Sequence, residues 1–430
     1  MATTGAQSDL PRLQQRTVRV LASAQVLGGI GVASGIAVGA LLAADLGTES
    51  LSGLASASSV IGAALISLPV ARLMNTRGRR LGLLLAYAVG ITGALLTITG
   101  ALVGIFSVAL VGMVLTGGGT AAGLQSRYAA TDLAVPEHRG RALGTVVWAT
   151  TVGSVLGPNL AQPMGHLAIS IGVPRLAGPY MLTVVTFVAA AAVIALFLRP
   201  DPLLVARGEA ARLSGTIDNL RRPTRSLRAS LSDIMRSPSA AVGLLAMASG
   251  HAVMVGVMAM TPIHLQHGGA SLGIIGLVIS GHISGMYIAS PLVGILSDRF
   301  GRHAVIVGGA LILLAAVGIA GTASEYDSTR IALGLFLLGL GWSCTLVAGS
   351  TLLTESVGSD VRPTVQGAAD LVMGVAGASA GVLSGVVVGL GSYGLLTVIA
   401  AVLVAPLPVI AIRDSRRVAS LTQLEAAAGP

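Results

Sequence analysis

Long apolar runs, each long enough to cross a bilayer as a helix, are the feature that most constrains this 430-residue chain. A hydrocarbon core of roughly 30 Å requires about 20 apolar residues per helix. Only 10% of the residues are charged and 53% are hydrophobic, which excludes a soluble enzyme, a disordered chain and a disulfide scaffold. We predict an all-α membrane protein with twelve transmembrane helices, at 18–45, 51–74, 81–101, 103–131, 140–165, 178–199, 239–263, 271–297, 304–322, 329–354, 364–389 and 393–413.

The distribution of basic residues predicts the orientation of these helices. All 26 basic residues are arginines, and the predicted loops place 24 of them on one side of the membrane, leaving only Arg175 and Arg330 on the other. Because cytoplasmic loops are enriched in positive charge, both termini are expected in the cytoplasm, with the chain in the plasma (inner) membrane. The charge is spread over one membrane face rather than gathered in a patch, so we expect no nucleic-acid partner.

The chain contains an internal repeat at an offset of 223 residues. A polar stretch at 200–238 divides an N-terminal six-helix half (1–199) from a C-terminal half with a tail (239–430). Parallel halves of this kind place a substrate site between them, near the bilayer midplane. The residue pairs that show the offset include Leu73/Leu296, Gly78/Gly301, Arg79/Arg302, Asp132/Glu355, Arg139/Arg362 and Gly144/Gly367.

The loop at 294–302 reads Gly-Ile-Leu-Ser-Asp-Arg-Phe-Gly-Arg. This segment resembles the signature G-x-L-x-D-R-x-G-R of the major facilitator superfamily (MFS). The resemblance covers about 18–413 and implies two pseudo-symmetric six-helix halves of the MFS fold. It also implies secondary active transport of a small molecule or metal ion by alternating access, by a monomer in the lipid bilayer that carries no cofactor.

The same resemblance implies a conformational latch at this loop and at its repeat. The candidate residues in the C-terminal half are Asp298, Arg299, Gly301, Arg302 and Glu355, and those in the N-terminal half are Arg79 and Asp132. Asn75 stands where the repeat expects an aspartate, which predicts a weaker latch there. The alternative is that these charges only anchor loops at the membrane surface.

The fifth predicted span carries Gly144, Gly153, Gly157 and Pro158. This spacing resembles the glycine-proline motif of proton-coupled MFS antiporters, although Ala161 and Gln162 replace the usual closing glycine pair. Small residues also let helices pack closely, and a proline can kink one. Antiport and simple helix packing therefore both remain open.

Two histidines and three methionines mark the seventh and eighth spans. Met254, Met258 and His251 share one helix face, and His282 and Met286 have the same i,i+4 spacing. If the two spans form a hairpin, Met254 and His282 lie at similar depth. Thioether and imidazole groups suit Cu(I), and the pattern resembles the CcoA-like copper importers of the MFS. Riboflavin transporters belong to the same wider branch, and methionines also serve as packing residues.

Copper import is the first substrate hypothesis. Proton-coupled efflux of small organic compounds or drugs is the alternative, riboflavin uptake is third, and a transporter-like sensor ranks last. We expect no enzyme activity, because no nucleophile–base pair or nucleotide-binding motif is recognised. Asp45, at the outer end of the first span, and Asp370, within the eleventh, are interpreted as residues that cap or line helix ends. Arg127, at the inner end of the fourth span, is interpreted as a structural partner of Asp132 or an anion ligand.

Overall fold

The computed structural model describes residues 4–47, 52–214 and 226–428, and these residues form α-helices and short 3-10 turns without a strand. Eleven helical spans within this part of the chain are long and apolar enough to cross a membrane. They do not include α5 (Arg139–Ser170), which is long but carries Asn159, Gln162 and His166 among its apolar residues. The all-helical membrane architecture agrees with the prediction.

The chain divides into two compact units, defined here as unit 1 (1–135, 145–231 and 358–375) and unit 2 (136–144, 232–357 and 376–430). These ranges differ from the predicted halves in two ways. Unit 1 includes most of the polar connector, and α5 and α14 are each shared between the units. The reason is that long helices can pack against different neighbours along their length.

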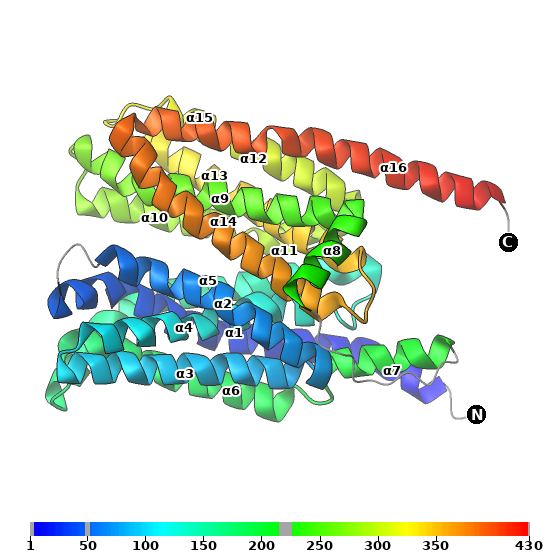
Figure 1. Cartoon of the computed structure of the whole chain (residues 1–430), viewed down its shortest axis with the longest axis horizontal. Coiled ribbons are helices and arrows are strands. Elements are labelled where there is room, and N and C mark those ends of the chain that lie inside the picture. Colours follow the sequence, from blue (N-terminus) through cyan, green and yellow to red (C-terminus); the bar gives the residue numbers. More distant parts are fainter. Residues whose placement is uncertain (1–3, 48–51, 215–225, 429–430) are drawn as a thin grey trace. The chain divides into compact units, whose positions relative to one another are not determined.

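Unit 1 is a bundle of long helices drawn in blue to green in Figure 1, apart from its segment of α14, which is orange. Within it, α4 packs against α1, α2 and α3, and α6 packs against α1 and α3. Glycines and alanines at these contacts let the helix backbones approach closely. Its helices are α1 (Thr4–Leu46), α2 (Ser52–Arg77), α3 (Arg79–Val103), α4 (Phe106–Ala129), most of α5, α6 (Gly178–Phe197), α7 (Pro202–Ser214) and the first part of α14 (Arg362–Leu390).

Unit 2 is organised around α13 (Ser328–Glu355), which is the most deeply buried of its helices. This helix packs against α9, α10, α11 and α12. The other helices of unit 2 are α9 (Pro238–His267), α10 (Leu272–Tyr287), α11 (Ser290–Phe300), α12 (Arg302–Gly321), the rest of α14, α15 (Tyr393–Val404) and α16 (Pro406–Ala428), with α8 (Leu227–Arg236) divided between the units.

Two of the predicted spans are each built from two helices. The eighth span consists of α10 and α11, which meet just before Pro291, and the twelfth consists of α15 and α16, which meet just before Pro406. Proline has no N–H to continue the helical ladder and its ring crowds the preceding turn, so each break falls where the sequence carries a proline.

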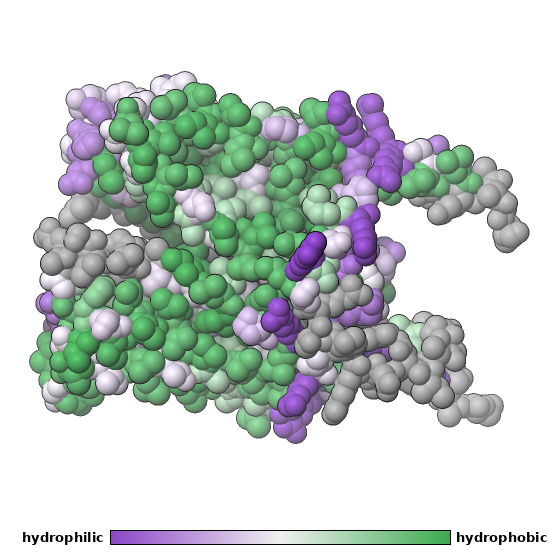
Figure 2. Space-filling view, viewed as in Figure 1, coloured by the Kyte–Doolittle hydropathy of each residue, from purple (hydrophilic) through white to green (hydrophobic). Residues whose placement is uncertain are grey.

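The surface is apolar along the helices and polar near their ends. Hydrophobic side chains cover most of the visible face of the helices in Figure 2, whereas the most hydrophilic residues gather toward the right of the view. Large side chains such as Leu65, Val185, Leu277 and Val402 are exposed. Continuous apolar exposure of this kind fits a lipid environment rather than water.

Candidate functional site

A charged cluster in unit 2 surrounds Arg302, at the start of α12. Its guanidinium pairs with Asp298 at 2.8 Å and with Glu355 at 3.0 Å. The Asp298 carboxylate also accepts hydrogen bonds from the backbone N–H groups of Gly140 (2.9 Å) and Arg141 (2.8 Å), in the first turn of α5. The N–H groups in the first turn of a helix have no acceptor within that helix, so these groups and the helix dipole both favour a carboxylate at this position. The structure therefore brings three of the predicted latch residues together and adds α5 to their contacts.

The two other predicted residues of this loop have different roles. Gly301 has a φ of +90° and a ψ of 153°, a conformation open essentially only to glycine, and it forms the turn between α11 and α12. Arg299 lies over the ring of Phe300, and the distance from the central carbon of its guanidinium to the ring centroid is 5.5 Å. Arg139, which the sequence analysis noted only as part of the repeat, approaches Glu355 at 3.6 Å.

The corresponding pair in unit 1 is fully buried. Arg79 contacts the Asp132 carboxylate through Nε at 2.8 Å and through Nη2 at 3.1 Å, and neither side chain has exposed surface. Arg79 Nη2 also donates to Oε1 of Gln366 on α14, at 2.7 Å. The predicted partners, Arg79 on α3 and Asp132 in the turn after α4, are in contact, and Gln366 extends the cluster to α14, which the motif did not indicate.

Asn75, the departure from the repeat, is bound by the connector. Arg207 of α7 donates to the backbone oxygen of Asn75 at 2.7 Å and to its Oδ1 at 2.6 Å. Arg207 Nη2 also donates to the backbone oxygen of Asp360 at 3.3 Å. The repeat places Pro363 opposite Gly140, and a proline has no N–H to donate to an acid at position 75. A neutral acceptor that binds Arg207 fits this local chemistry.

A second buried ion pair of unit 1 joins α4 to the first part of α14. Arg127 Nη2 donates to Asp370 Oδ1 at 2.5 Å, and Gln125 Nε2 donates to Oδ2 at 2.8 Å. The hydroxyl of Tyr128 donates to Oδ1 at 3.3 Å. The interpretation of Arg127 as a partner of Asp132 was wrong, because Asp132 pairs with Arg79. Asp370 was interpreted as capping or lining a helix end, but it lies more than two turns inside α14 and is fully buried.

The three motif glycines of α5 all lie where helix backbones nearly touch. A Cβ built on Gly153 would lie 2.6 Å from Cα of Gly29 on α1, and one on Gly157 would lie 2.7 Å from Cβ of Ala33. In unit 2, a Cβ on Gly144 would collide with the backbone of Ser290. Pro158 lies inside the same helix. These contacts favour the packing interpretation of the glycine-proline motif.

The proposed copper ligands lie on α9 and α10, but both helices pack mainly on α13 rather than on each other. The ring nitrogen Nδ1 of His282 is 2.8 Å from the backbone oxygen of Leu335, and Nδ1 of His251 accepts from Nε1 of Trp342 at 3.0 Å. Both partners belong to α13. The structure thus places α13 against both histidines, a different arrangement from the two-helix hairpin that the sequence suggested.

The methionines on these helices differ in exposure: Met254 and Met286 are buried and Met258 is half-buried. The Nε2 atom of His282 is buried and has no hydrogen-bond partner in the described part of the chain. Over the same residues, no group of three His, Cys, Asp or Glu side chains is placed to hold a metal ion. Any metal site here would therefore depend on methionine sulfur.

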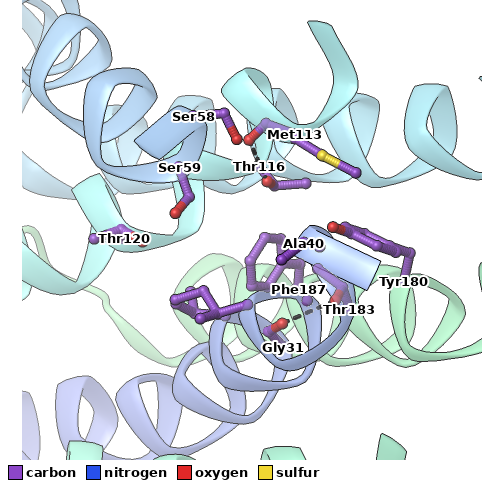
Figure 3. A pocket seen from close by; sticks show the side chains of 14 residues that line it. Gly31, Ala40, Ser58, Ser59, Met113, Thr116, Thr120, Tyr180, Thr183 and Phe187 are labelled. Carbon is purple, nitrogen blue, oxygen red and sulfur yellow. Dashed lines mark hydrogen bonds between the residues drawn. The ribbon is translucent and has the colours of Figure 1, made fainter. Parts of the chain in front are cut away.

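A small cavity in unit 1, of about 70 Å³, opens between α1, α2, α4 and α6 (Figure 3). Figure 3 shows Ser59 and Thr120 on one side of it, across from Tyr180 and Phe187. None of its lining residues is charged. Besides glycines and aliphatic side chains, the lining consists of Ser58, Ser59, Met113, Thr116, Thr120, Tyr180, Thr183 and Phe187. This site could not be predicted from the sequence, because hydroxyl residues on separate helices form no motif.

The chain belongs to the major facilitator superfamily, whose model matches residues 21–271 and 244–427. Two uncharacterised MFS-type transporters of Bacillus subtilis (strain 168) are similar to this chain. YdeG is 39% identical, and the match covers 91% of this chain and 90% of YdeG. YddS is 37% identical, and the match covers 91% of this chain and 89% of YddS. The riboflavin transporter RfnT of Brucella anthropi is 27% identical, over 84% of this chain and 85% of RfnT.

Solved structures support the same fold. The Escherichia coli fucose:proton symporter FucP matches with a TM-score of 0.68 at 18% identity, covering 92% of this chain and 97% of FucP. A bacterial homologue of the iron transporter ferroportin matches with a TM-score of 0.70 at 15% identity, covering 93% of this chain and 99% of that one. The chain is therefore a multi-pass membrane transporter with the predicted MFS fold. Its substrate is a separate question.

Proposed function

We propose that this transporter moves a small, uncharged organic solute with hydroxyl groups across the plasma membrane by alternating access. The observation that carries the proposal is the uncharged, hydroxyl-lined cavity of unit 1. Hydroxyl groups donate and accept hydrogen bonds, so they bind a hydroxylated solute without the desolvation cost of a buried charge. An aromatic wall, Tyr180 and Phe187, adds apolar contact.

The size of the cavity limits what it can hold. A volume of about 70 Å³ accepts part of a solute, such as a hydroxylated arm, rather than a fused ring system. Riboflavin carries a hydroxylated chain on a ring system, and RfnT is a named riboflavin transporter. Riboflavin is therefore the first solute to test. We rank uptake of a hydroxylated organic solute above copper import.

The test is uptake of radiolabelled riboflavin by cells that express the wild type or Thr120→Val. Valine keeps the shape of threonine but loses the hydroxyl, and one neutral hydrogen bond contributes about 0.5–1.5 kcal/mol. We expect KM to rise roughly two- to tenfold. Thr99→Val, at an exposed site on α3, is the matched control. Equal KM values for Thr120→Val and wild type would contradict the assigned cavity.

Copper import is kept as a second candidate because Nε2 of His282 is buried and has no hydrogen-bond partner among the residues that the structure describes. Neutral imidazole nitrogen and the sulfur of Met254 or Met286 are soft ligands suited to Cu(I). The same cells are assayed for radioactive copper uptake with wild type and His282→Ala, each quantified at the membrane. Loss of uptake in the variant alone would support copper; equal uptake by both would remove this candidate.

The predicted topology and oligomeric state are part of the proposal. With 24 of 26 arginines on one predicted side, both termini are expected in the cytoplasm. Epitope tags at either end should bind antibody only after the cells are permeabilised. Light scattering of the purified protein should give the mass of a monomer. The efflux alternative is tested with inverted vesicles, in which an exporter would accumulate solute.

A further inference from the structure

In the ion pair between Arg127 and Asp370, the aspartate differs from the latch residues in its position along its helix. The latch residues Arg79 and Arg302 are the first residues of α3 and α12. Asp370, by contrast, lies more than two turns inside α14, and its partner Arg127 lies in the last turn of α4. Both belong to unit 1 and are at most 2% exposed as side chains.

The surroundings of Asp370 contain few groups that can change charge. From α4, Arg127 and Tyr128 face its carboxylate, together with the neutral amide of Gln125. The Arg79–Asp132 pair reaches α14 one turn earlier, through Gln366. On the side of α2, α14 presents Gly367 and Gly374, which contact Ala71 and Ala64. No other titratable group in the described part of the chain is recorded in contact with Asp370.

Burying this pair of charges carries a cost in desolvation free energy. Moving two charges out of water costs several kcal/mol per ion, and apolar residues of similar volume often replace a buried pair without loss of stability. Ionisable residues inside a membrane span commonly mark proton or substrate pathways for this reason. Of the two partners only the carboxylate can gain a proton, because arginine stays protonated.

Unpartnered polar atoms next to the pair point to a ligand. Nε and Nη1 of Arg127 and Oε1 of Gln125 are buried and have no hydrogen-bond partner within the described protein. Buried polar atoms of native proteins are normally satisfied by protein groups or by ordered water. Two donors and one acceptor beside a carboxylate are the groups that could bind a water molecule able to deliver a proton to it.

We propose that Asp370 is a proton-binding site that couples transport to a proton gradient. A proton from water adds to the carboxylate and converts it to a neutral carboxylic acid, while Arg127 keeps its charge. The Coulomb attraction between α4 and α14 is then lost. Since α14 continues from unit 1 into unit 2 beyond residue 375, protonation acts on a helix common to both units. The inference rests on the proposed transport function but assumes no particular solute.

The test measures the proton directly, by infrared difference spectroscopy of the purified full-length protein between acidic and alkaline buffer. A protonated carboxylic acid has its own C=O stretching band. We expect a pH-dependent band in wild type, its loss in Asp370→Asn, and a shift of its frequency in Asp370→Glu. The matched control, Asp132→Asn, removes the other buried aspartate that pairs with an arginine and should leave the band unchanged.

Each outcome decides the proposal. If Asp370→Asn does not fold, the frequency shift in Asp370→Glu still assigns the band to this position. A band that is the same in wild type and Asp370→Glu, or one that is lost in Asp132→Asn, would overturn the assignment. Other carboxylates of the chain also gain protons in acid, so a purely structural ion pair would give the same pH-dependent bands in wild type, Asp370→Asn and Asp370→Glu. The infrared experiment measures protonation of Asp370 and uses no riboflavin. A failed riboflavin uptake assay would therefore contradict the proposed solute without affecting the proposed proton site.

Discussion

The contact between the connector and Asn75 can be tested by replacing Arg207 with alanine. The Arg207 side chain is buried and makes two short hydrogen bonds to Asn75, at 2.7 and 2.6 Å. Arg212 lies on the same helix and is exposed, so Arg212→Ala removes an arginine of α7 without removing this contact. The two variants therefore separate the effect of the contact from the effect of charge.

The expected size of the effect follows from the hydrogen bonds. A hydrogen bond to a charged group contributes about 1.5–3 kcal/mol, and the lower value applies where water can replace the lost partner. Two such bonds give about 3 kcal/mol, and every 1.4 kcal/mol corresponds to a factor of ten. The local opening of α7 should therefore become roughly 100-fold more frequent in Arg207→Ala.

Hydrogen exchange followed by mass spectrometry measures this opening in purified protein. The acceleration should be strongest in the second half of α7, because Asp201 still accepts from the N–H of Leu203 at 3.1 Å and holds the first turn. Arg212→Ala should change exchange by about twofold at most, since exposed substitutions usually cost within about 0.5 kcal/mol. Similar exchange in both variants would refute the argument that Arg207 fastens the connector.

Two further predictions concern glycines, and both are measured as thermal unfolding of the purified protein in detergent. Gly153→Leu should lower the unfolding temperature, because its side chain would overlap the backbone of Gly29, and overpacking costs about 1–3 kcal/mol. Gly308→Leu is the control, since a Cβ there meets no atom within 4 Å; equal unfolding temperatures would contradict the packing role of α5. Gly301→Ala should also destabilise, by about 1–3 kcal/mol, because its φ is +90°. Gly308→Ala should leave the unfolding temperature nearly unchanged, and an equal loss in both variants would argue against backbone strain.

The helices were predictable from the sequence to within a few residues in most cases. The span predicted at 329–354 is α13, Ser328–Glu355, and that predicted at 304–322 is α12, Arg302–Gly321. Backbone groups in lipid must find partners within their own helix, so apolar length and helix length coincide. The prediction is less complete at 271–297 and 393–413, where prolines divide the span into two helices.

The charged contacts were predictable only where a motif fixed their positions. The repeat and the loop signature identified Arg79 with Asp132, and Arg302 with Asp298 and Glu355, and the structure brings both sets into contact. No motif indicated the contact of Arg207 with Asn75, or that of Gln366 with Arg79. The hairpin arrangement proposed for His282 and Met254 likewise relied on neighbouring spans packing together, whereas α13 packs against both.

The sequence by itself determined the membrane environment, the helices and the superfamily, because these depend on local hydropathy and on short contiguous motifs. Only the tertiary structure decided which helices meet. Arg127 and Asp370 are separated by 243 positions in the chain, yet their side chains pair at 2.5 Å. Such pairs depend on which helices the packed bundle brings together, and that is a property of the bundle rather than of any one segment.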